Sequence, residues 1–238
     1  MKKAFVTGAS KGIGLAVAHK LISEGVEVVG TYNTTKSDNE DIQYYQVDLS
    51  DREQTKNLMK KLDTKKFDYI VNCAGLFEEE SIEDFDLAKW DKSIEVMLTA
   101  PYIIIEALSK NMITGSAIVN IVSNDAATGA FAGFAYSASK SALISLTKSL
   151  GNVLGYRGIR VNAIAPGWID TDMGPENDTI KKAAEEITPL GRIGNPQEIA
   201  NTTSFLLSEQ ASFVNGAVIF ADGGQSNVDY TLYKEWRS

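Results

Sequence analysis

The sequence predicts an α/β protein with a three-layer, doubly wound fold and a mainly parallel sheet of about seven strands. Short runs rich in Val and Ile alternate along the chain with longer stretches that have helical spacing. Most of the short runs are continuously apolar, which is typical of strands covered on both faces. Strands that alternate with helices are joined by right-handed crossovers, and these crossovers produce a parallel sheet.

The first part of the chain supplies three strands and two helices. An apolar strand at 4–7 leads through a glycine cluster into an amphipathic helix at 12–24. The Val-rich run 26–32 and the run 42–47 are the second and third strands. A helix with apolar residues at helical spacing follows at 52–62.

The second part continues the alternation of strand and helix. The strand 69–72 precedes a long helix at 87–110, and the strand 117–122 precedes a helix of small and apolar residues at 136–155. The remaining expected elements are the strand 160–164, the helix 196–208 and the strand 217–220.

One domain over 1–238 is expected, because 238 residues lie at the upper end for one α/β domain and the chain has neither a repeat nor a linker. Residues 167–195 mix Gly, Pro, Asp and Asn around one short charged helical patch. Ligands of open sheets bind beyond the carboxyl ends of the strands. This segment follows such an end, so it is predicted to be a substrate lid. The alternative is an ordinary surface excursion.

Composition excludes several function classes. The chain is 44% hydrophobic and 23% charged, with 31 acidic and 23 basic residues and a net charge of −8. That charge disfavours nucleic acid and anionic membranes as partners. One Cys and one His predict no internal disulfide and no metal site. With neither a signal-peptide pattern nor an apolar run long enough to span a membrane, a cytoplasmic location is expected.

A glycine cluster with the spacing G-x-x-x-G-x-G joins the first strand to the first helix. Gly8, Gly12 and Gly14 permit a tight turn and a close approach of the backbone to a ligand. The amino end of the following helix presents unpaired N–H groups to an anion. In this position the cluster predicts a dinucleotide phosphate site, whereas a glycine cluster alone would indicate only a turn.

The end of the second strand favours NADP over NAD. Preference for NAD usually comes from an acidic residue at that position, and Tyr32 and Asn33 stand there instead. Lys11 and Lys36 would attract a 2′-phosphate, although both could equally be solvated surface charges. Asp48 would accept a hydrogen bond from the adenine, or could cap the next helix together with Ser50.

Tyr136 and Lys140 lie four residues apart and share a helix face. Two other Tyr–Lys pairs have this spacing, so spacing alone indicates nothing. Tyr136 differs because a serine, Ser123, precedes it by thirteen residues, directly after an apolar strand. Lys140 would bring the pKa of Tyr136 towards a useful acid/base range, and Ser123 would donate a hydrogen bond to the substrate oxygen. The alternative is a packing pair on a helix.

These motifs together resemble the short-chain dehydrogenase/reductase family, in its compact single-domain branch, which includes the 3-oxoacyl-acyl-carrier-protein reductases. The matching motifs are Thr7-Gly8-x-x-x-Gly12-x-Gly14, Asn72-Cys73-Ala74-Gly75, Ser123, Tyr136-x-x-x-Lys140, Asn162-x-x-x-Pro166-Gly167 with Thr171, and Asp222-Gly223-Gly224.

The resemblance implies a Rossmann-type fold, hydride transfer between NAD(P) and a carbonyl or secondary alcohol, and a homotetramer or homodimer. It assigns catalysis to Ser123, Tyr136 and Lys140. The expected cofactor-binding residues are Gly8, Ser10, Lys11, Gly12, Ile13, Gly14, Asn33, Asp48, Leu49, Asn72, Ala74, Gly75, Tyr136, Lys140, Pro166, Gly167, Ile169 and Thr171.

Two features depart from the family pattern. The family's fourth catalytic residue is an Asn, and Met97 stands in its place; a thioether is only a weak acceptor. Residues 225–238 form a C-terminal extension that the pattern does not explain. A carrier-linked substrate would also need a basic docking patch, for which Arg157, Arg160 and Arg192 are the candidates.

The expected activity is NADPH-dependent reduction of a small ketone, either 3-oxoacyl-type or another, free or linked to a carrier. The alternatives are an NAD-linked alcohol dehydrogenase and a dinucleotide-binding sensor or scaffold without useful turnover. The acidic run Glu78-Glu79-Glu80 is interpreted as a solvated loop.

Overall fold

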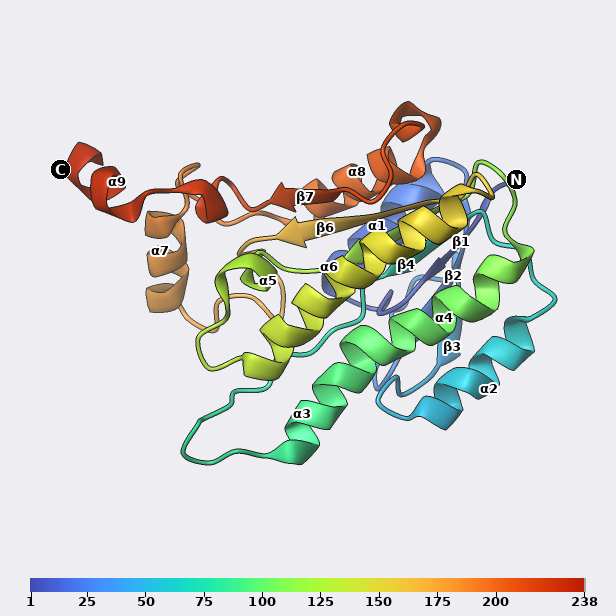
Figure 1. Cartoon of the computed structure of the whole chain (residues 1–238), viewed down its shortest axis with the longest axis horizontal. Helices are drawn as coiled ribbons and strands as arrows, with labels where there is room; N and C mark the ends of the chain where they lie inside the picture. Colours follow the sequence, from blue (N-terminus) through green and yellow to red (C-terminus); the bar gives the residue numbers. More distant parts are fainter. Residues whose placement is uncertain (238) are drawn as a thin grey trace.

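The computed structural model describes residues 1–237, so Ser238, the last residue of the predicted domain and of its C-terminal extension, lies outside the described residues. Seven strands form one sheet in the order β3-β2-β1-β4-β5-β6-β7. Every pairing between them is parallel. The predicted doubly wound fold is confirmed, and Figure 1 shows helices on both faces of the sheet.

All seven predicted strands are present, and their ends agree with the prediction to within two residues, with 69–72 identical to β4. Along β1 the side chains alternate between faces, because Val6 packs in one core cluster and Phe5 in the other. The edge strand β3 is buried only at Ile42. The strands are β1 (Lys3–Val6), β2 (Glu27–Tyr32), β3 (Ile42–Gln46), β4 (Tyr69–Asn72), β5 (Ala117–Ile121), β6 (Arg160–Pro166) and β7 (Val218–Ala221).

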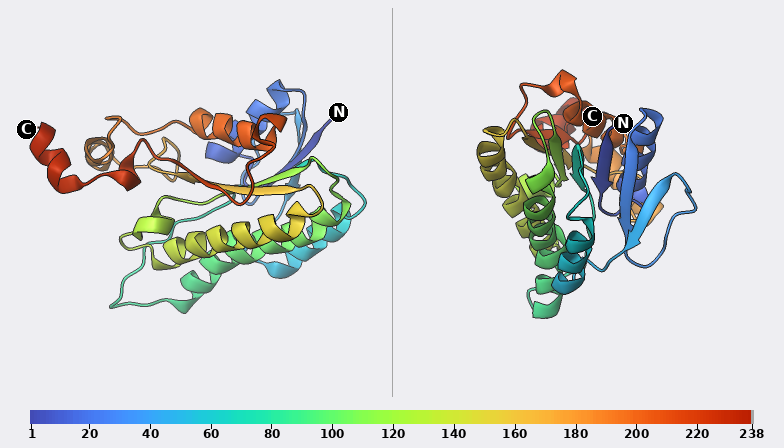
Figure 2. Two further views of the ribbon diagram at one scale, coloured as in Figure 1. Left: turned by 45° about the horizontal axis from the view of Figure 1, so that its top comes forward. Right: turned by 90° about the vertical axis from the view of Figure 1, so that its right-hand side faces the viewer.

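The helices form two layers. In Figure 2, α1 and α8 lie together on one face of the sheet, and α2, α4 and α6 cover the other. Each layer encloses its own core cluster, with Leu21 and Ile199 in one and Leu58 and Ile104 in the other. The α-helices are α1 (Gly12–Ser23), α2 (Arg52–Leu62), α3 (Leu87–Ile94), α4 (Ala100–Leu108), α5 (Asp125–Thr128), α6 (Phe134–Gly155), α7 (Asp178–Ile187), α8 (Pro196–Leu207) and α9 (Tyr230–Arg237).

The long helix predicted at 87–110 is interrupted. A π-helical segment, Glu95–Thr99, separates α3 from α4, and a short 3₁₀ turn follows α4. Pro101 has no N–H to donate to the carbonyl of Met97 four residues earlier, so the regular α-helical bonding pattern cannot continue there. The interruption therefore falls on Met97, the residue that departs from the family pattern.

The segment 167–195 leaves and rejoins the body of the protein at adjacent points. Asp170 donates its N–H to the carbonyl of Gly194, and Gly194 donates to Trp168. Between these bonds the segment carries α7, whose first turn is capped by Asn177. α9 follows β7 and lies beyond α7 at the far end of the molecule from the N-terminus (Figure 1). No helix within residues 1–237 is long and apolar enough to cross a membrane.

Candidate active site

Ser123, Tyr136 and Lys140 come together beyond the carboxyl end of β5. Ser123 lies two residues after that strand, and the other two lie in the first two turns of α6. The Nζ atom of Lys140 is 5.7 Å from the centre of the Tyr136 ring. Ser123 and Lys140 are buried, with 6% and 3% of their surface exposed. The three residues singled out in the sequence therefore form one cluster, in which Ser123 and Lys140 are buried and Tyr136 is partly buried.

The hydroxyl of Ser123 is held by Asp125, a residue that the sequence analysis did not single out. The N–H of Asp125 donates to Ser123 Oγ at 3.1 Å, and Ser123 Oγ donates to Asp125 Oδ2 at 3.3 Å. Burial raises the pKa of the Asp125 carboxyl. Its signal in the sequence was a lone carboxylate two residues after Ser123, four residues beyond the end of β5.

The phenol of Tyr136 stays protonated across the neutral range. Burial raises the pKa of Tyr136 to about 12, against a smaller lowering by its hydrogen bond with Ser123. From the sequence we expected Lys140 to lower the pKa of Tyr136 towards the neutral range, and that prediction is wrong for this structure. Desolvation of the phenolate outweighs attraction to Lys140 because the ring is enclosed, in part by Phe77, which meets it edge to face at 5.5 Å.

Lys140 is buried among groups that offer it little compensation. Its Nζ donates to the carbonyl of Ile121 at 2.9 Å. Burial lowers the pKa of Lys140 to about 8. Burial also raises the pKa of the neighbouring Cys73 thiol to about 12, so this thiol is neutral at pH 7. Lys140 is therefore mainly an ammonium at pH 7, with a pKa well below its ordinary value.

Met97 lies beside this ammonium group. A Cβ added at Gly75 would lie 3.6 Å from Lys140 Nζ and 3.7 Å from Met97 Sδ, so Gly75 fits between the two side chains. Met97 has no exposed surface. A thioether therefore occupies the place next to Lys140 where the family has a carboxamide.

The glycine loop is built as a cradle. Gly8 has φ +65°, and a Cβ there would lie 3.0 Å from Ala74 Cα. Gly14 passes so close to Gly8 that a Cβ would lie 2.2 Å from its carbonyl oxygen. Gly12 has φ +53° and faces Thr171. Side chains at Gly8 and Gly14 would collide with neighbouring backbone, so the tight path of this loop requires glycine at these positions.

The amino end of α1 is left without a cap. Lys11 makes no capping hydrogen bond, and the first turn holds no acidic residue. By contrast, α2 and α8 are capped by Asp51 and Asn195. Free N–H groups at a helix amino end suit a phosphate, so the loop and α1 fit a dinucleotide pyrophosphate.

The two lysines expected near the ribose both have other partners here. Lys11 Nζ lies 3.3 Å from Asp172 Oδ2 of the segment 167–195, with both side chains largely exposed. Lys36 Nζ lies 5.6 Å from the centre of the Tyr44 ring. The backbone carbonyl of Asn33 accepts a hydrogen bond from Gln46 Nε2. The Asn33 side chain, just after the end of β2, is exposed.

Asp48 is bound within its own loop. Its Oδ1 accepts from the N–H of Ser50 at 2.9 Å and from the Ser50 hydroxyl at 2.7 Å. The alternative that Asp48 caps the next helix is wrong, because Asp51 provides that cap through Glu53 and Gln54. The second carboxylate oxygen of Asp48 remains available to a ligand, and the neighbouring Leu49 is buried.

The remaining expected cofactor residues lie along the carboxyl ends of the strands. Asn72 Nδ2 donates to Asn120 Oδ1 at 2.8 Å inside the sheet, whereas Asn72 Oδ1 is buried and has no hydrogen-bond partner among the described residues. Ala74 donates its N–H to Thr7 Oγ1 at 3.0 Å. Ser10, Ile13, Gly75, Pro166, Gly167, Ile169 and Thr171 are each at least partly buried around the same edge.

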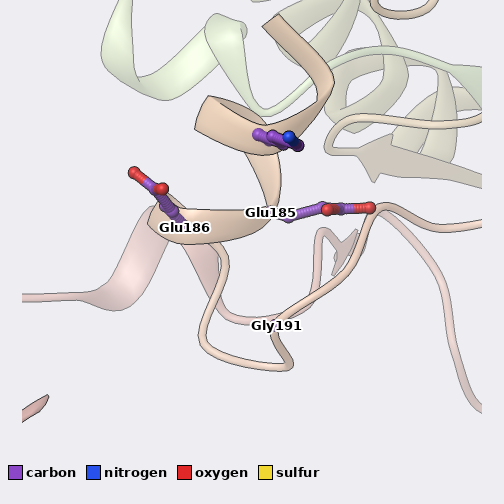
Figure 3. A pocket seen from close by; sticks show the side chains of 4 residues that line it. Glu185, Glu186 and Gly191 are labelled. Carbon is purple, nitrogen blue, oxygen red and sulfur yellow. The ribbon is translucent and has the colours of Figure 1, made fainter. Parts of the chain in front are cut away.

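Two surface hollows lie near the segment 167–195. One follows α1 and is lined in part by Gly12, His19 and Asp172. The other lies against α7, and Figure 3 shows that Glu185 and Glu186 point away from each other there, so they cannot hold one ion together. Within residues 1–237 no group of His, Cys, Asp or Glu is arranged to bind a metal.

Known proteins resemble this chain in sequence and in architecture. The family model described as Enoyl-(Acyl carrier protein) reductase matches residues 8–226. The 3-oxoacyl-[acyl-carrier-protein] reductase of Aquifex aeolicus is 36% identical, over 94% of this chain and 96% of that protein. The 2-dehydro-3-deoxy-D-gluconate 5-dehydrogenase of Bacillus subtilis is 33% identical, over 94% of each chain.

Solved structures agree with these relatives. A short chain dehydrogenase family protein from Francisella tularensis superimposes with a TM-score of 0.89 at 33% identity, covering 96% of this chain and all of that one. A blue fluorescent protein from a metagenomic library, in complex with NADPH, gives a TM-score of 0.88 at 32% identity, covering 94% and 97% of the two chains.

Proposed function

The chain belongs to the short-chain dehydrogenase/reductase family of oxidoreductases, and from that premise we propose that it reduces a small ketone to a secondary alcohol with NADPH. The observation that carries this proposal is the cluster of Ser123, Tyr136 and Lys140 beside an uncapped helix and a glycine cradle. When bound, the nicotinamide cofactor supplies the hydride that reduces the carbonyl carbon.

Each residue of the cluster has a separate task. Ser123 donates a hydrogen bond to the carbonyl oxygen as negative charge develops on it. Tyr136 donates its phenolic proton to that oxygen, which completes the alcohol. Lys140 stabilises the resulting phenolate with its ammonium charge and donates to the ribose hydroxyls of the cofactor. Asp125 orients the Ser123 hydroxyl through the two hydrogen bonds between them.

The protonation state of Tyr136 suits the reductive reaction at neutral pH. A pKa of about 12 keeps the phenol in its acid form at neutral pH, ready to donate. Oxidation of an alcohol would need the phenolate, which is scarce at that pH. The phenol is therefore in the form that proton donation to a carbonyl oxygen requires.

A free ketone suits this chain better than a carrier-linked one. All three arginines considered for carrier docking have hydrogen-bond or ion-pair partners within the chain. Arg157 donates to backbone carbonyls that include Ser109, Arg160 donates to Leu206 and its neighbours, and Arg192 pairs with Glu198. Docking of an acidic carrier protein would have to compete with these partners, although Arg157 and Arg192 are exposed. We also propose that the enzyme is cytoplasmic and forms a homodimer or homotetramer. Residues 167–195 would close over the bound substrate as a lid.

The experiment that tests this function measures oxidation of NADPH and NADH by the purified protein against a panel of free ketones. Turnover with NADPH on at least one ketone, abolished by a substitution at Tyr136, is the expected result. Binding of NADPH without turnover on any ketone would favour a sensor or scaffold. Faster turnover with NADH would overturn the cofactor assignment.

Replacing Asn33 by Asp is expected to reverse the cofactor preference. A carboxylate at the end of β2 accepts hydrogen bonds from the ribose hydroxyls of NADH and repels the 2′-phosphate of NADPH. We expect the Kd for NADPH to rise by at least about tenfold, since one unscreened like-charge contact is worth more than about 1.4 kcal/mol. Quenching of tryptophan fluorescence gives both Kd values, and Asp38→Asn in the following loop is a control for surface charge. A Kd for NADPH that does not change would contradict this placement.

Replacing Met97 by Asn is expected to keep or raise the reduction rate, by up to about tenfold. The carboxamide would bring donors and acceptors to the neighbourhood of the Lys140 ammonium, where the thioether provides only a weak acceptor. Met97→Leu, which keeps the volume but removes the sulfur, is the matched control and should leave kcat unchanged. Measured as kcat per folded molecule, a large loss in the Asn variant alone would count against a role for this position in proton transfer.

A further inference from the structure

The three consecutive glutamates at 78–80 have three different surroundings. Glu78 forms an ion pair with Lys92 of α3. The Glu79 side chain is exposed, and the Glu79 backbone carbonyl accepts a hydrogen bond from Lys89 Nζ. Glu80 is partly buried against the start of α6. The interpretation of this run as a solvated loop is therefore wrong for Glu80.

Glu80 is bound to the start of the helix that carries Tyr136. Its Oε2 accepts from the N–H of Ala135, the residue before Tyr136, at 2.7 Å. Its own N–H donates to the carbonyl of Ala132 at 2.9 Å. Its Oε1 is buried and has no hydrogen-bond partner among the described residues. The loop after β4 and the loop before α6 are therefore joined in both directions.

This carboxylate replaces the cap that α6 lacks. The residue before α6 is Gly133, which has no side chain to accept from the first N–H groups. A carboxylate at a helix amino end also interacts favourably with the helix dipole. The loop before α6 needs such support, because Ala132 is in the left-handed region with φ +54°, a conformation that non-glycine residues rarely adopt.

The same loop also holds the Tyr136 ring. Phe77 meets this ring edge to face, with centroids 5.5 Å apart. Phe77 also fills the space beside Gly133 so closely that a Cβ there would lie 2.5 Å from Phe77 Cε2. Residues 77 and 80 thus contact the Tyr136 side chain and the backbone next to it. Movement of this loop would move the phenol.

We propose that Glu80 is a positioning residue for Tyr136. Glu80 fixes the first turn of α6 and keeps Phe77 against the phenol ring. This inference rests on the proposed function of Tyr136 as the proton donor. It assigns to the loop after β4 a share in the geometry of proton transfer, and a misplacement of a reacting group by 1 Å costs about 10²-fold in rate.

The test compares Glu80→Ala, Glu80→Gln and Glu79→Ala in the full-length protein. The Gln variant keeps an acceptor for the Ala135 N–H but removes the charge. Glu79→Ala removes one charge from the same run without touching α6. For each variant kcat, KM, the Kd for NADPH and the melting temperature are measured, with Tyr136→Phe assayed in parallel.

We expect Glu80→Ala to lower kcat by about 10- to 100-fold, with KM and the Kd for NADPH within about twofold of wild type. Glu80→Gln should recover kcat to within about threefold, and Glu79→Ala should match wild type. A Glu80→Ala variant that melts earlier yet keeps the wild-type kcat per folded molecule would show a structural cap only and overturn the inference. If Tyr136→Phe is itself fully active, the proposed function fails, which is a separate result.

Discussion

Replacing Tyr136 by Phe is expected to lower kcat/KM for ketone reduction by about 10³-fold or more and to leave the Kd for NADPH within about twofold. The variant removes one hydroxyl group, the only atom group of Tyr136 that donates a proton. Positioned acids contribute about 10² to 10⁴ in rate. The loss should reach the upper part of this range, because burial holds the pKa of Tyr136 at about 12 and keeps the phenol fully in its donor form.

The fold of the Phe variant should be intact. The ring keeps its edge-to-face contact with Phe77, and only the hydrogen bond with Ser123 is lost. Single-turnover and steady-state assays with NADPH give the rate, and fluorescence quenching gives the Kd. Tyr230→Phe is the matched control, because Tyr230 also has a lysine four residues later but lies in the C-terminal extension. Turnover within about fivefold of wild type would remove Tyr136 from proton transfer.

The clustering of the three proposed catalytic residues could be predicted because they lie on or next to regular elements. Ser123 follows a strand, and Tyr136 and Lys140 share one face of a helix, so chain position alone brings them to one edge of the sheet. Asp125 and Glu80 lie outside such patterns. Glu80 meets Ala135 across 55 residues of chain, and only the folded path of two loops brings them together.

The sign of the pKa shift of Tyr136 could not be predicted for a related reason. Sequence shows that a lysine is near, but the degree of enclosure by Phe77 and the rest of the site is a tertiary property. The break at Met97 is similar, because the apolar spacing of 87–110 continues through it and only Pro101 indicates the change in hydrogen bonding. Lys11 likewise lies near Asp172, far along the chain, where the sequence suggested either a phosphate or a solvated surface charge.

Replacing Lys140 by Met is expected to have two opposite effects: loss of activity and gain of stability. Activity should fall by at least about 10²-fold in kcat/KM, because the ammonium that stabilises the Tyr136 phenolate is removed. Stability should rise because the ammonium is buried and donates a hydrogen bond to the carbonyl of Ile121, with no carboxylate paired to it among the described residues. A buried lysine retained at this cost is consistent with selection for activity over stability.

The size and pH dependence of the stability gain follow from linkage. The pKa of Lys140 is about 8 in the folded protein and 10.5 as its ordinary value, so burial of the charge costs about 3 kcal/mol below pH 8. Losing the hydrogen bond to Ile121 offsets about 1 kcal/mol. The Met variant should therefore be more stable by about 2 kcal/mol at pH 7. Since the folded wild type binds fewer protons than the unfolded chain between pH 8 and 10.5, wild-type stability rises with pH across that range.

Urea unfolding of wild type and Lys140→Met at pH 7 and at pH 10 measures both expectations, with kcat/KM measured on the same samples at pH 7. The difference in unfolding free energy should be about 2 kcal/mol at pH 7 and should shrink, or change sign, by pH 10, where wild-type Lys140 is neutral in the folded state. Lys148→Met is the matched control, because Lys148 is on the same helix with its side chain exposed, and it should change stability by less than about 0.5 kcal/mol. A Met variant less stable than wild type at pH 7 would mean that other groups, such as the Ile121 carbonyl, compensate the Lys140 charge in full. In that case the ammonium would be a structural element of α6 as well as a catalytic one, and its loss of activity could no longer be attributed to the phenolate alone.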